Sequence, residues 1–377
     1  MAFGKKNLPS KSPVDYNLCL LGLSKSGKTT LIFNVLEKLC PGGYLFVETG
    51  RERGADAITG IEYINCPTWS QEFDEANNAV GFAELINDIV KNKNEEYPDL
   101  KVLVIDTQDQ LAEMAEAQIV KEYNRKQKLD NKPTVDSINA AFAGYGRGEQ
   151  KARELVSTME DKLVSVGVRV WYIGHAKTKD VVDPITNTTY TTITSQIPQS
   201  WFNSLKRNLH FLGLLYTNMD VVTEKKKVGA GEKNFNTVTS EARKIRWRSD
   251  NMVADCGSRF ADIVEEIDCD ADEFIKALTD AIDAEIQKSG KSDKELKAEQ
   301  KKADEAKAKK IAKNIEAVAN DEKLEEVTNA IMDWISDNRD DKEKLKPVLA
   351  SLKEHGSKKP TEITDLEVAE EIFTLCK

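Results

Sequence analysis

The sequence has few prolines, no long apolar run and no paired cysteines. Only 10 of its 377 residues are proline and 40% are hydrophobic, so the chain can bury a sizeable core, with room for two or three domains. No uninterrupted apolar segment approaches the roughly 20 residues that a membrane span requires, and the N-terminus lacks an apolar signal core. The sequence therefore predicts a soluble protein that is not exported and has no membrane partner.

The six cysteines are scattered, without a C-x-x-C pair. Isolated cysteines are typical of reduced thiols in a cytoplasm and give no support to a zinc site, so we expect a cytoplasmic location. The net charge of −10 argues against a protein that binds polyanions through its overall charge, but it says nothing of a local basic groove.

One stretch carries a specific motif. Residues 22–29 follow the pattern G-x-x-x-x-G-K-[ST] of a phosphate-binding loop, between the apolar run 18–21 and a helical pattern. In such a loop backbone N–H groups point at a phosphate, the lysine contacts its terminal oxygens, and the final hydroxyl is offered to Mg²⁺. The alternative is a Gly/Ser-rich turn without a ligand. The residues expected to hold ATP are Gly22, Leu23, Ser24, Lys25, Ser26, Gly27, Lys28, Thr29 and Thr30, with Thr29 also on the metal.

Two acidic residues end apolar runs that are typical of buried parallel strands. Glu48 follows residues 44–47, and Asp106 follows residues 101–105. An acid at the exit of such a strand, downstream of a phosphate loop, can hold Mg²⁺ through water from the opposite side. Asp106 is therefore the second expected magnesium residue; the alternative is an ordinary strand end.

Strands and helices alternate up to about residue 174, which predicts an α/β fold with a mostly parallel sheet. Later segments favour antiparallel strands at 211–222 and 242–248, a hairpin or extended loop at 177–196 and a closing helix at 271–287. The expected domains are a flexible arm (1–15), the core (16–287), a charged, solvated helical linker (288–319) and a small helical module (320–377). The polar stretch 124–145 is interpreted as a mobile loop.

The segment 206–248 is basic, with ten Lys or Arg residues against four acidic ones. It can form a groove for a polyanion or a charged, solvated hairpin, and charge alone does not separate the two. The aromatic residues Tyr190, Trp201 and Phe202 near this segment can stack on bases or pack in the core.

Several classes of phosphate-loop protein are excluded by absent motifs. A GTPase needs a glycine three residues after the strand-end acid, whereas Asp106 is followed by Thr-Gln-Asp, and no N-K-x-D base reader is present. No L-S-G-G-Q segment of a transporter ATPase occurs. A small nucleotide kinase has no need of the basic strands and the appended tail.

The order of the remaining motifs resembles a RecA-like P-loop ATPase. The phosphate loop, Glu48, Asp106, the Gly144-Tyr145-Gly146 approach to a helix and the strand ending at His175 follow that order over roughly residues 15 to 285. More narrowly, the chain is similar to the minimal RecA-like ATPases that bacteriophages encode for recombination. The resemblance implies Mg²⁺-dependent ATP hydrolysis, binding of single-stranded DNA and self-association into a filament or ring.

The resemblance also assigns roles to single residues. Glu48 matches the acid that polarises the attacking water; a surface ion pair with Arg51 or Arg53 is the alternative. His175 stands where the family links the γ-phosphate to DNA, although RecA has Gln there and a lone His is often an ordinary capped side chain. Segments 125–145 and 176–198 match the two DNA-facing loops by position only.

Arg248, with Arg246 as second choice, matches cations that reach the nucleotide of the adjacent subunit; facing DNA or solvent is the alternative. If these two point to one face of a strand, Ile245 and Trp247 are buried on the other.

A rival function is an ATPase that remodels or switches a protein partner without touching DNA, and a third is a nucleotide-binding scaffold. The acidic C-terminal module favours contact with another protein.

Overall fold

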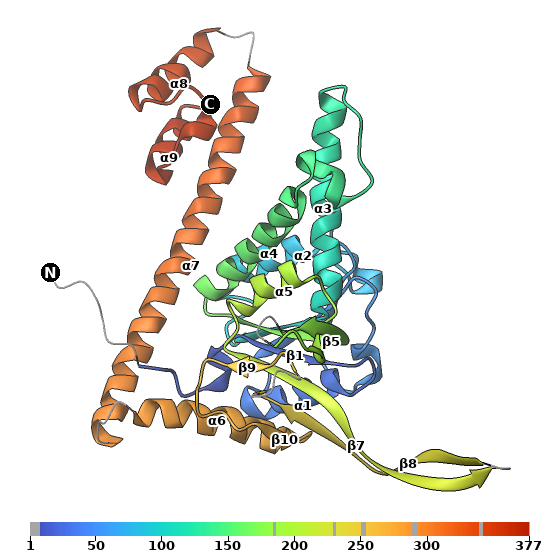
Figure 1. Cartoon of the computed structure of the whole chain (residues 1–377). Coiled ribbons are helices and arrows are strands. Elements are labelled where there is room, and N and C mark those ends of the chain that lie inside the picture. Colours follow the sequence, from blue (N-terminus) through green and yellow to red (C-terminus); the bar gives the residue numbers. More distant parts are fainter. Residues whose placement is uncertain are drawn as a thin grey trace.

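The computed structural model describes residues 8–183, 186–228, 231–249, 254–288, 293–338 and 342–376. These residues form a ten-stranded sheet with helices on both faces, a protruding hairpin and a C-terminal helical region (Figure 1). The predicted α/β class is confirmed, because the central strands are parallel and the later strands antiparallel. In the described ranges no helix has the length and apolar character to cross a membrane.

The parallel strands are β1 (Leu18–Gly22), β2 (Tyr44–Thr49), β3 (Tyr63–Cys66), β4 (Val102–Asp106), β5 (Arg169–Val182) and β7 (Phe211–Val228). Their order across the sheet is β7-β1-β5-β4-β2-β3. β1 therefore lies inside the sheet, and all its residues are buried. A parallel strand covered on both faces must be apolar on both sides, which explains the continuous apolar run before the phosphate loop.

The antiparallel strands are β6 (Thr189–Ser195), β8 (Gly231–Arg246), β9 (Gly257–Ser258) and β10 (Glu266–Asp268). β8 pairs with β7, so the hairpin predicted from 211–222 and 242–248 is present and longer than expected. β6 pairs with β5, which makes the Thr-rich segment after His175 a hairpin. For residues 220–228 of β7 and 231–240 of β8 the structure describes only the backbone.

Two layers of helices cover the sheet. The first contains α1 (Lys28–Leu39) and α6 (Ala271–Gln287), and the second contains α2 (Phe82–Lys91), α3 (Gln108–Leu129), α4 (Arg147–Ser165) and α5 (Gln199–Lys206). Side chains alternate between the layers along each strand, so Leu18 and Leu20 pack with α1 while Cys19 and Leu21 pack with the second layer.

Some local predictions need correction. Trp201 and Phe202 are only 2% and 1% exposed and pack in the second layer, so stacking on bases is wrong for both. Much of the stretch interpreted as a mobile loop is helical, since α3 continues to Leu129 and a 3₁₀ segment spans Ile138–Ala143. Tertiary packing decides both cases, which local composition does not show.

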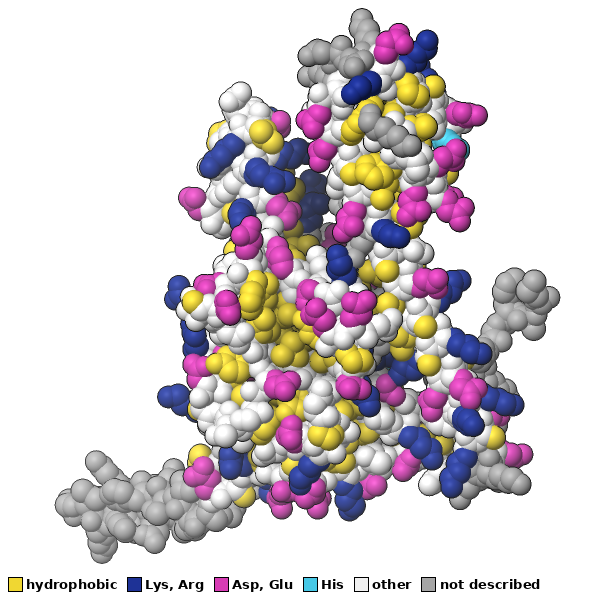
Figure 2. All heavy atoms as spheres, turned by 180° about the vertical axis from the view of Figure 1, so that it is seen from behind, with side chains coloured by type: hydrophobic (Ala, Val, Ile, Leu, Met, Phe, Trp, Pro, Cys, Tyr) yellow, Lys and Arg dark blue, Asp and Glu magenta, His cyan; other side chains and the backbone are white. Residues whose placement is uncertain are grey.

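The C-terminal region consists of α7 (Asp293–Asp337), α8 (Lys342–Glu354) and α9 (Leu366–Thr374). The end of α7 packs with α8 and α9 around a small apolar cluster that includes Ile331, Leu352 and Ile372, which is the kind of helical module predicted. Figure 2 shows hydrophobic side chains gathered on this module, across a furrow from the outer ends of α3 and α4.

The first part of α7 is helical as expected, but it is not solvated on all sides. Leu296 and Ile315 are buried against the core, and Asn314 Nδ2 donates to Ser165 O at 2.8 Å. The few apolar residues of this segment recur at helical spacing on one face, so their low number was misleading. The prediction of a solvated linker is wrong in this respect.

The described part of the N-terminal arm, residues 8–15, is also packed. Val14 is buried, and Gln300 Nε2 of α7 donates to Pro9 O at 3.0 Å. Residues 1–7 of the predicted flexible arm lie outside the described residues.

Candidate nucleotide site

The phosphate loop joins the buried end of β1 to the first turn of α1. Gly27 has φ +95° and Lys25 has φ +62°, so the chain passes twice through the left-handed region. Gly27 adopts this conformation without a steric cost, and α1 begins directly after it. The loop therefore lies at a helix N-terminus, where the macrodipole favours an anion.

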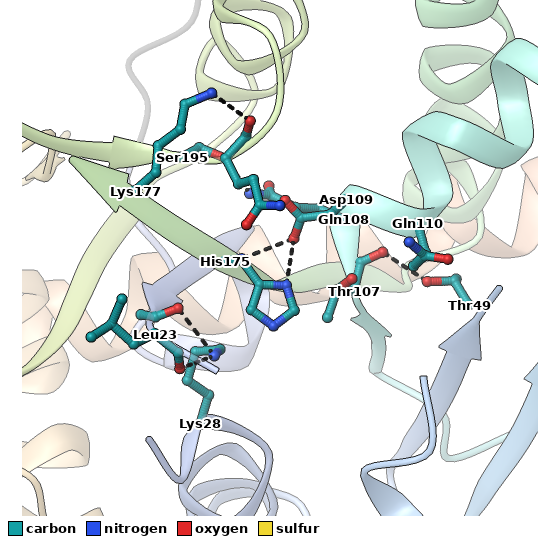
Figure 3. Close-up of polar contacts among 12 residues, drawn as sticks. Leu23, Lys28, Thr49, Thr107, Gln108, Asp109, Gln110, His175, Lys177 and Ser195 are labelled. Carbon is teal, nitrogen blue, oxygen red and sulfur yellow. Dashed lines mark hydrogen bonds and ion pairs between the residues drawn. The ribbon is translucent and has the colours of Figure 1, made fainter. Parts of the chain in front are cut away.

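Lys28 is held inside the loop. Its Nζ donates to Gly22 O at 3.2 Å and to Leu23 O at 2.8 Å (Figure 3). Burial lowers the pKa of the Lys28 ammonium, while the nearby charge of Asp106 acts in the opposite direction. An ammonium group has three N–H donors, so one remains for a phosphate oxygen.

Thr29 and Asp106 meet, as the sequence predicted for the metal position. Thr29 Oγ1 donates to Asp106 Oδ2 at 2.7 Å, and burial raises the pKa of Asp106. The backbone of Gly54 closes this side: a Cβ there would lie 3.4 Å from both oxygens. Hydroxyl and carboxylate oxygens suit Mg²⁺, so Thr29 and Asp106 would hold it there. Bound Mg²⁺ neutralises charge on the phosphates.

Glu48, the next-to-last residue of β2, lies beside Asp106 of β4, since the two residues are register partners. Glu48 is only 2% exposed, and its Oε1 accepts a hydrogen bond from Ala55 N at 2.6 Å. Its Oε2 is buried and has no hydrogen-bond partner among the residues that the structure describes. The alternative of a surface ion pair with an arginine is therefore wrong. Burial raises the pKa of Glu48 to about 7, a value suited to a general base.

His175 lies beside the phosphate loop, because the β1–β5 register pairs it with Gly22. Its Nδ1 is 3.3 Å from Asp109 Oδ2, and its backbone N–H donates to the same oxygen at 2.8 Å (Figure 3). The hydrogen bond to Asp109 raises the pKa of the imidazole. The sequence analysis missed Asp109, which orients His175. The role of His175 in coupling ATP to DNA stays a prediction.

Gln108 connects this region to the β5–β6 hairpin. Its Nε2 donates to Ser195 Oγ at 2.9 Å, at the end of β6 (Figure 3). Gln108 and Asp109 open α3, two residues after the metal-site acid Asp106. The base of the hairpin is thereby fixed to the strand end that carries the metal site.

A phosphate loop, a Thr–Asp metal position and a buried carboxylate thus converge at the carboxyl ends of β1, β4 and β2. The sequence profile of the AAA domain family matches residues 15–247, more than half of the chain. This chain belongs to the AAA domain family. It is accordingly a nucleotide-binding P-loop ATPase, with ATP as its substrate. No curated protein matches the chain.

The AAA domain contains an arginine at the loop that the sequence analysis did not select. Arg243 Nη1 of β8 donates to Ser26 O at 3.2 Å, and a Cβ on Gly27 would lie 2.7 Å from this Nη1. Arg243 also lines a cavity of about 440 Å³ with Thr30 and Asn34 of α1. Side chains alternate along a strand, so the sequence could have indicated that Arg243 lies on the same face of β8 as Ile245 and Trp247. Only the register with β7 places Arg243 at the phosphate loop.

Ile245 and Trp247 are buried, as predicted, and Arg246 points to the other face. There Arg246 Nη2 lies 3.0 Å from Glu266 Oε2 of β10 in the same chain. The register also places Arg246 at the level of Leu214, and β8 runs antiparallel, so Arg248 lies still farther from the chain's own loop. A role for either arginine in the adjacent subunit stays a prediction.

Proposed function

We propose that this AAA domain ATPase binds single-stranded DNA and assists homologous recombination or strand annealing, in a self-associated form such as a filament or ring. The observation that supports DNA coupling is the course of the two strands that flank β1. Both strands pass the level of the phosphate loop and continue into hairpins.

The two hairpins start at residues that contact the nucleotide site. β5 continues beyond His175 and pairs with β6, whereas β7 and β8 project from the sheet together beyond Arg243 (Figure 1). A ligand on either hairpin can therefore act on the loop through a rigid strand. The segment 125–145, by contrast, lies at the outer end of α3, away from the sheet (Figure 1).

The sequence of the β7–β8 hairpin is suited to a phosphate backbone. It contributes Lys225, Lys226, Lys227 and Lys233, and β5, on the other side of β1, adds exposed Lys177 and Lys179. Lysines that neutralise phosphates release counterions, which gives affinity without base specificity.

Hydrolysis follows from the geometry of the chain's own groups. A water in line with the γ-phosphate transfers a proton to Glu48 Oε2 as its oxygen attacks phosphorus, and the bond to the β,γ-bridging oxygen breaks to release ADP. Lys28 and the loop N–H groups hold the charge that develops on the phosphate oxygens. The buried, unpartnered Oε2 is the acceptor that this step needs.

The alternative is an ATPase that remodels a protein partner without binding DNA. It is favoured by the internal pairing of several predicted basic residues, because Lys206 contacts Asp255, and Lys244 and Arg246 share Glu266. These cations are less available to a polyanion than the sequence suggested.

The test is the ATPase rate measured with single-stranded DNA, with duplex DNA and with neither, at low and high salt. We expect stimulation by single-stranded DNA, and an affinity that falls steeply as salt rises. Replacement of Lys225, Lys226 and Lys227 by Gln should weaken DNA binding and flatten the salt dependence, whereas Gln at the exposed Lys302, Lys309 and Lys310 of α7 should not. A rate indifferent to DNA at low salt would favour the remodelling function.

A further inference from the structure

The cavity of about 440 Å³ beside the phosphate loop lies between α1 and the start of α6 (Figure 1). It follows one face of α1, from Gly27 and Thr30 at the loop to Glu37 and Lys38 two turns farther on. Its volume is within the range of about 300 to 1,000 Å³ that is typical of small-molecule sites. We call it the α1–α6 cavity.

The order of the strands places this cavity at one end of a bound nucleotide. The loop follows β1, and Asp106 and Glu48 lie at the carboxyl ends of β4 and β2 on one side of it. Arg243 belongs to β8, on the opposite side of β1. Because the γ-phosphate is held where the metal and the carboxylate act, the phosphate chain crosses the loop and its nucleoside end leaves toward β8. That end meets the α1–α6 cavity.

The polar groups along α1 differ in their availability to a ligand. Tyr44 donates a hydrogen bond to Glu37, and Lys38 Nζ lies 2.7 Å from Asp272 Oδ1, so the outer end of the cavity is paired within the chain. Asn34, between this end and the loop, is exposed, and its side chain has no hydrogen-bond partner in the described part of the chain. An asparagine amide offers both a donor and an acceptor, and both remain for a ligand here.

The other wall of the cavity is the start of α6, where Asp270 supplies a fixed acceptor. Asp270 caps the helix, since its Oδ1 accepts hydrogen bonds from Asp272 N at 2.8 Å and from Glu273 N at 3.2 Å. These bonds lower the pKa of Asp270, so it is ionised at neutral pH. A carboxylate has about four lone-pair sites, so acceptor positions remain. Leu31 and Ala271 add buried apolar surface against which a flat ring can pack.

We propose that the α1–α6 cavity holds the adenine base of the nucleotide and that Asn34 and Asp270 select this base. Adenine carries an amino group at N6 beside the acceptor N7, and an asparagine amide can pair with both. The second N–H of the amino group is then available to the carboxylate of Asp270. Guanine has the acceptor O6 in place of the amino group, and the carboxylate of Asp270 and the amide oxygen of Asn34 both repel it. The inference concerns the ATPase itself and does not depend on DNA binding.

The test measures binding of ADP and of GDP to the full chain by isothermal titration calorimetry, with Mg²⁺ and without DNA. The two nucleotides share their phosphates and ribose, so the ratio of their Kd values reports the base alone. We expect ADP to bind at least about tenfold more tightly than GDP. Asn34→Ala and Asp270→Asn should each lower this preference about fivefold or more. Asparagine caps a helix as well as aspartate does, so Asp270→Asn keeps α6 intact.

Two variants serve as controls. Arg243→Ala removes a group at the loop end of the cavity, so it should weaken both nucleotides alike and leave their ratio unchanged. Asn87→Ala makes the same substitution as Asn34→Ala at an exposed asparagine of α2, in the other helix layer, and should change neither Kd. Thermal unfolding followed by circular dichroism shows that each variant is folded.

Equal affinity of the parent chain for ADP and GDP would overturn the proposal, and so would cavity variants that leave the ratio at the parental value. A preference for GDP that Asp270→Asn removes would assign the cavity to guanine, whose N–H groups a carboxylate can also accept. Because DNA is absent, each of these results is distinct from a failure of the DNA-binding proposal.

Discussion

Glu48 shows how burial determines the chemistry of a single residue. A carboxyl group with a pKa of about 7 is partly protonated at neutral pH, and only its ionised form can accept a proton from water. We therefore expect kcat/KM for ATP to fall as the pH decreases through about 7. Steady-state rates measured across this range check the prediction.

The variant Glu48→Gln supplies the control. It should bind ATP with nearly unchanged affinity, because the loop makes the phosphate contacts. Its kcat should fall by a factor of about 10² to 10⁴, and the pH dependence should disappear.

The pH dependence of stability provides a second measurement of the role of Glu48. The folded state binds this proton more tightly than the unfolded state, so the contribution of Glu48 to the free energy of unfolding is present below about 4.5 and is lost as the pH rises through about 7. Hydrolysis by Glu48→Gln at the parental rate would make the role of Glu48 structural.

Arg243 is the second residue whose role depends on position. Its guanidinium lies on the phosphate loop and lines the cavity beside it, where charge-assisted hydrogen bonds to a nucleotide are available. We expect Arg243→Ala to raise the Kd for ATP about tenfold, the effect of losing about 1.4 kcal/mol. Binding of a fluorescent ATP analogue measures this.

Lys244→Ala is the matched control for Arg243, because Lys244 is the next residue on β8 and pairs with Glu266 on the other side of the strand. Equal losses of affinity in the two variants would show that β8 is merely destabilised and that Arg243 makes no specific contact.

At the scale of elements, α7 combines two environments in one helix. Its first part contributes Leu296 to the layer of α1 and Ile315 to the layer of α2 to α4, while its end belongs to the C-terminal module. One helix thus contacts both faces of the core, although its sequence has the composition of a linker.

Truncation separates these two parts. Removal of residues 320–377 should leave the unfolding midpoint of the core nearly unchanged. Removal of 293–377 should lower the free energy of unfolding by about 3 kcal/mol or more, because each buried side chain such as Leu296 or Ile315 contributes about 1.5 to 3 kcal/mol. Urea unfolding of both truncated chains, followed by tryptophan fluorescence, makes the comparison. Identical midpoints would show that α7 does not stabilise the core.

At the scale of the whole molecule, the sequence was sufficient to predict those features of the fold and the site that depend on neighbouring residues in the chain. The phosphate loop, the strand-end acids Glu48 and Asp106 and the α/β class each depend on short patterns that fix a strand, a turn or a helix start. Arg243 and the packing of α7 depend on register and on distant contacts, which no window of sequence contains. The burial of Trp201 and Phe202 also depends on distant contacts, because an aromatic side chain suits a binding surface as well as a core.

The position of β1 has a consequence for synthesis of the chain. Its neighbours in the sheet are Trp171 and Phe211 opposite Leu18, so the strand made first pairs only with strands made much later. Pairing over such sequence separations carries a large loop-closure cost and folds slowly. While the ribosome adds the intervening residues, at about 5 to 20 per second, β1 has no partner strand for its backbone, and the face that carries Cys19 and Leu21 lacks the later helices that cover it. The ability to hold ATP is therefore acquired late in synthesis, although the residues that hold it are among the first to emerge.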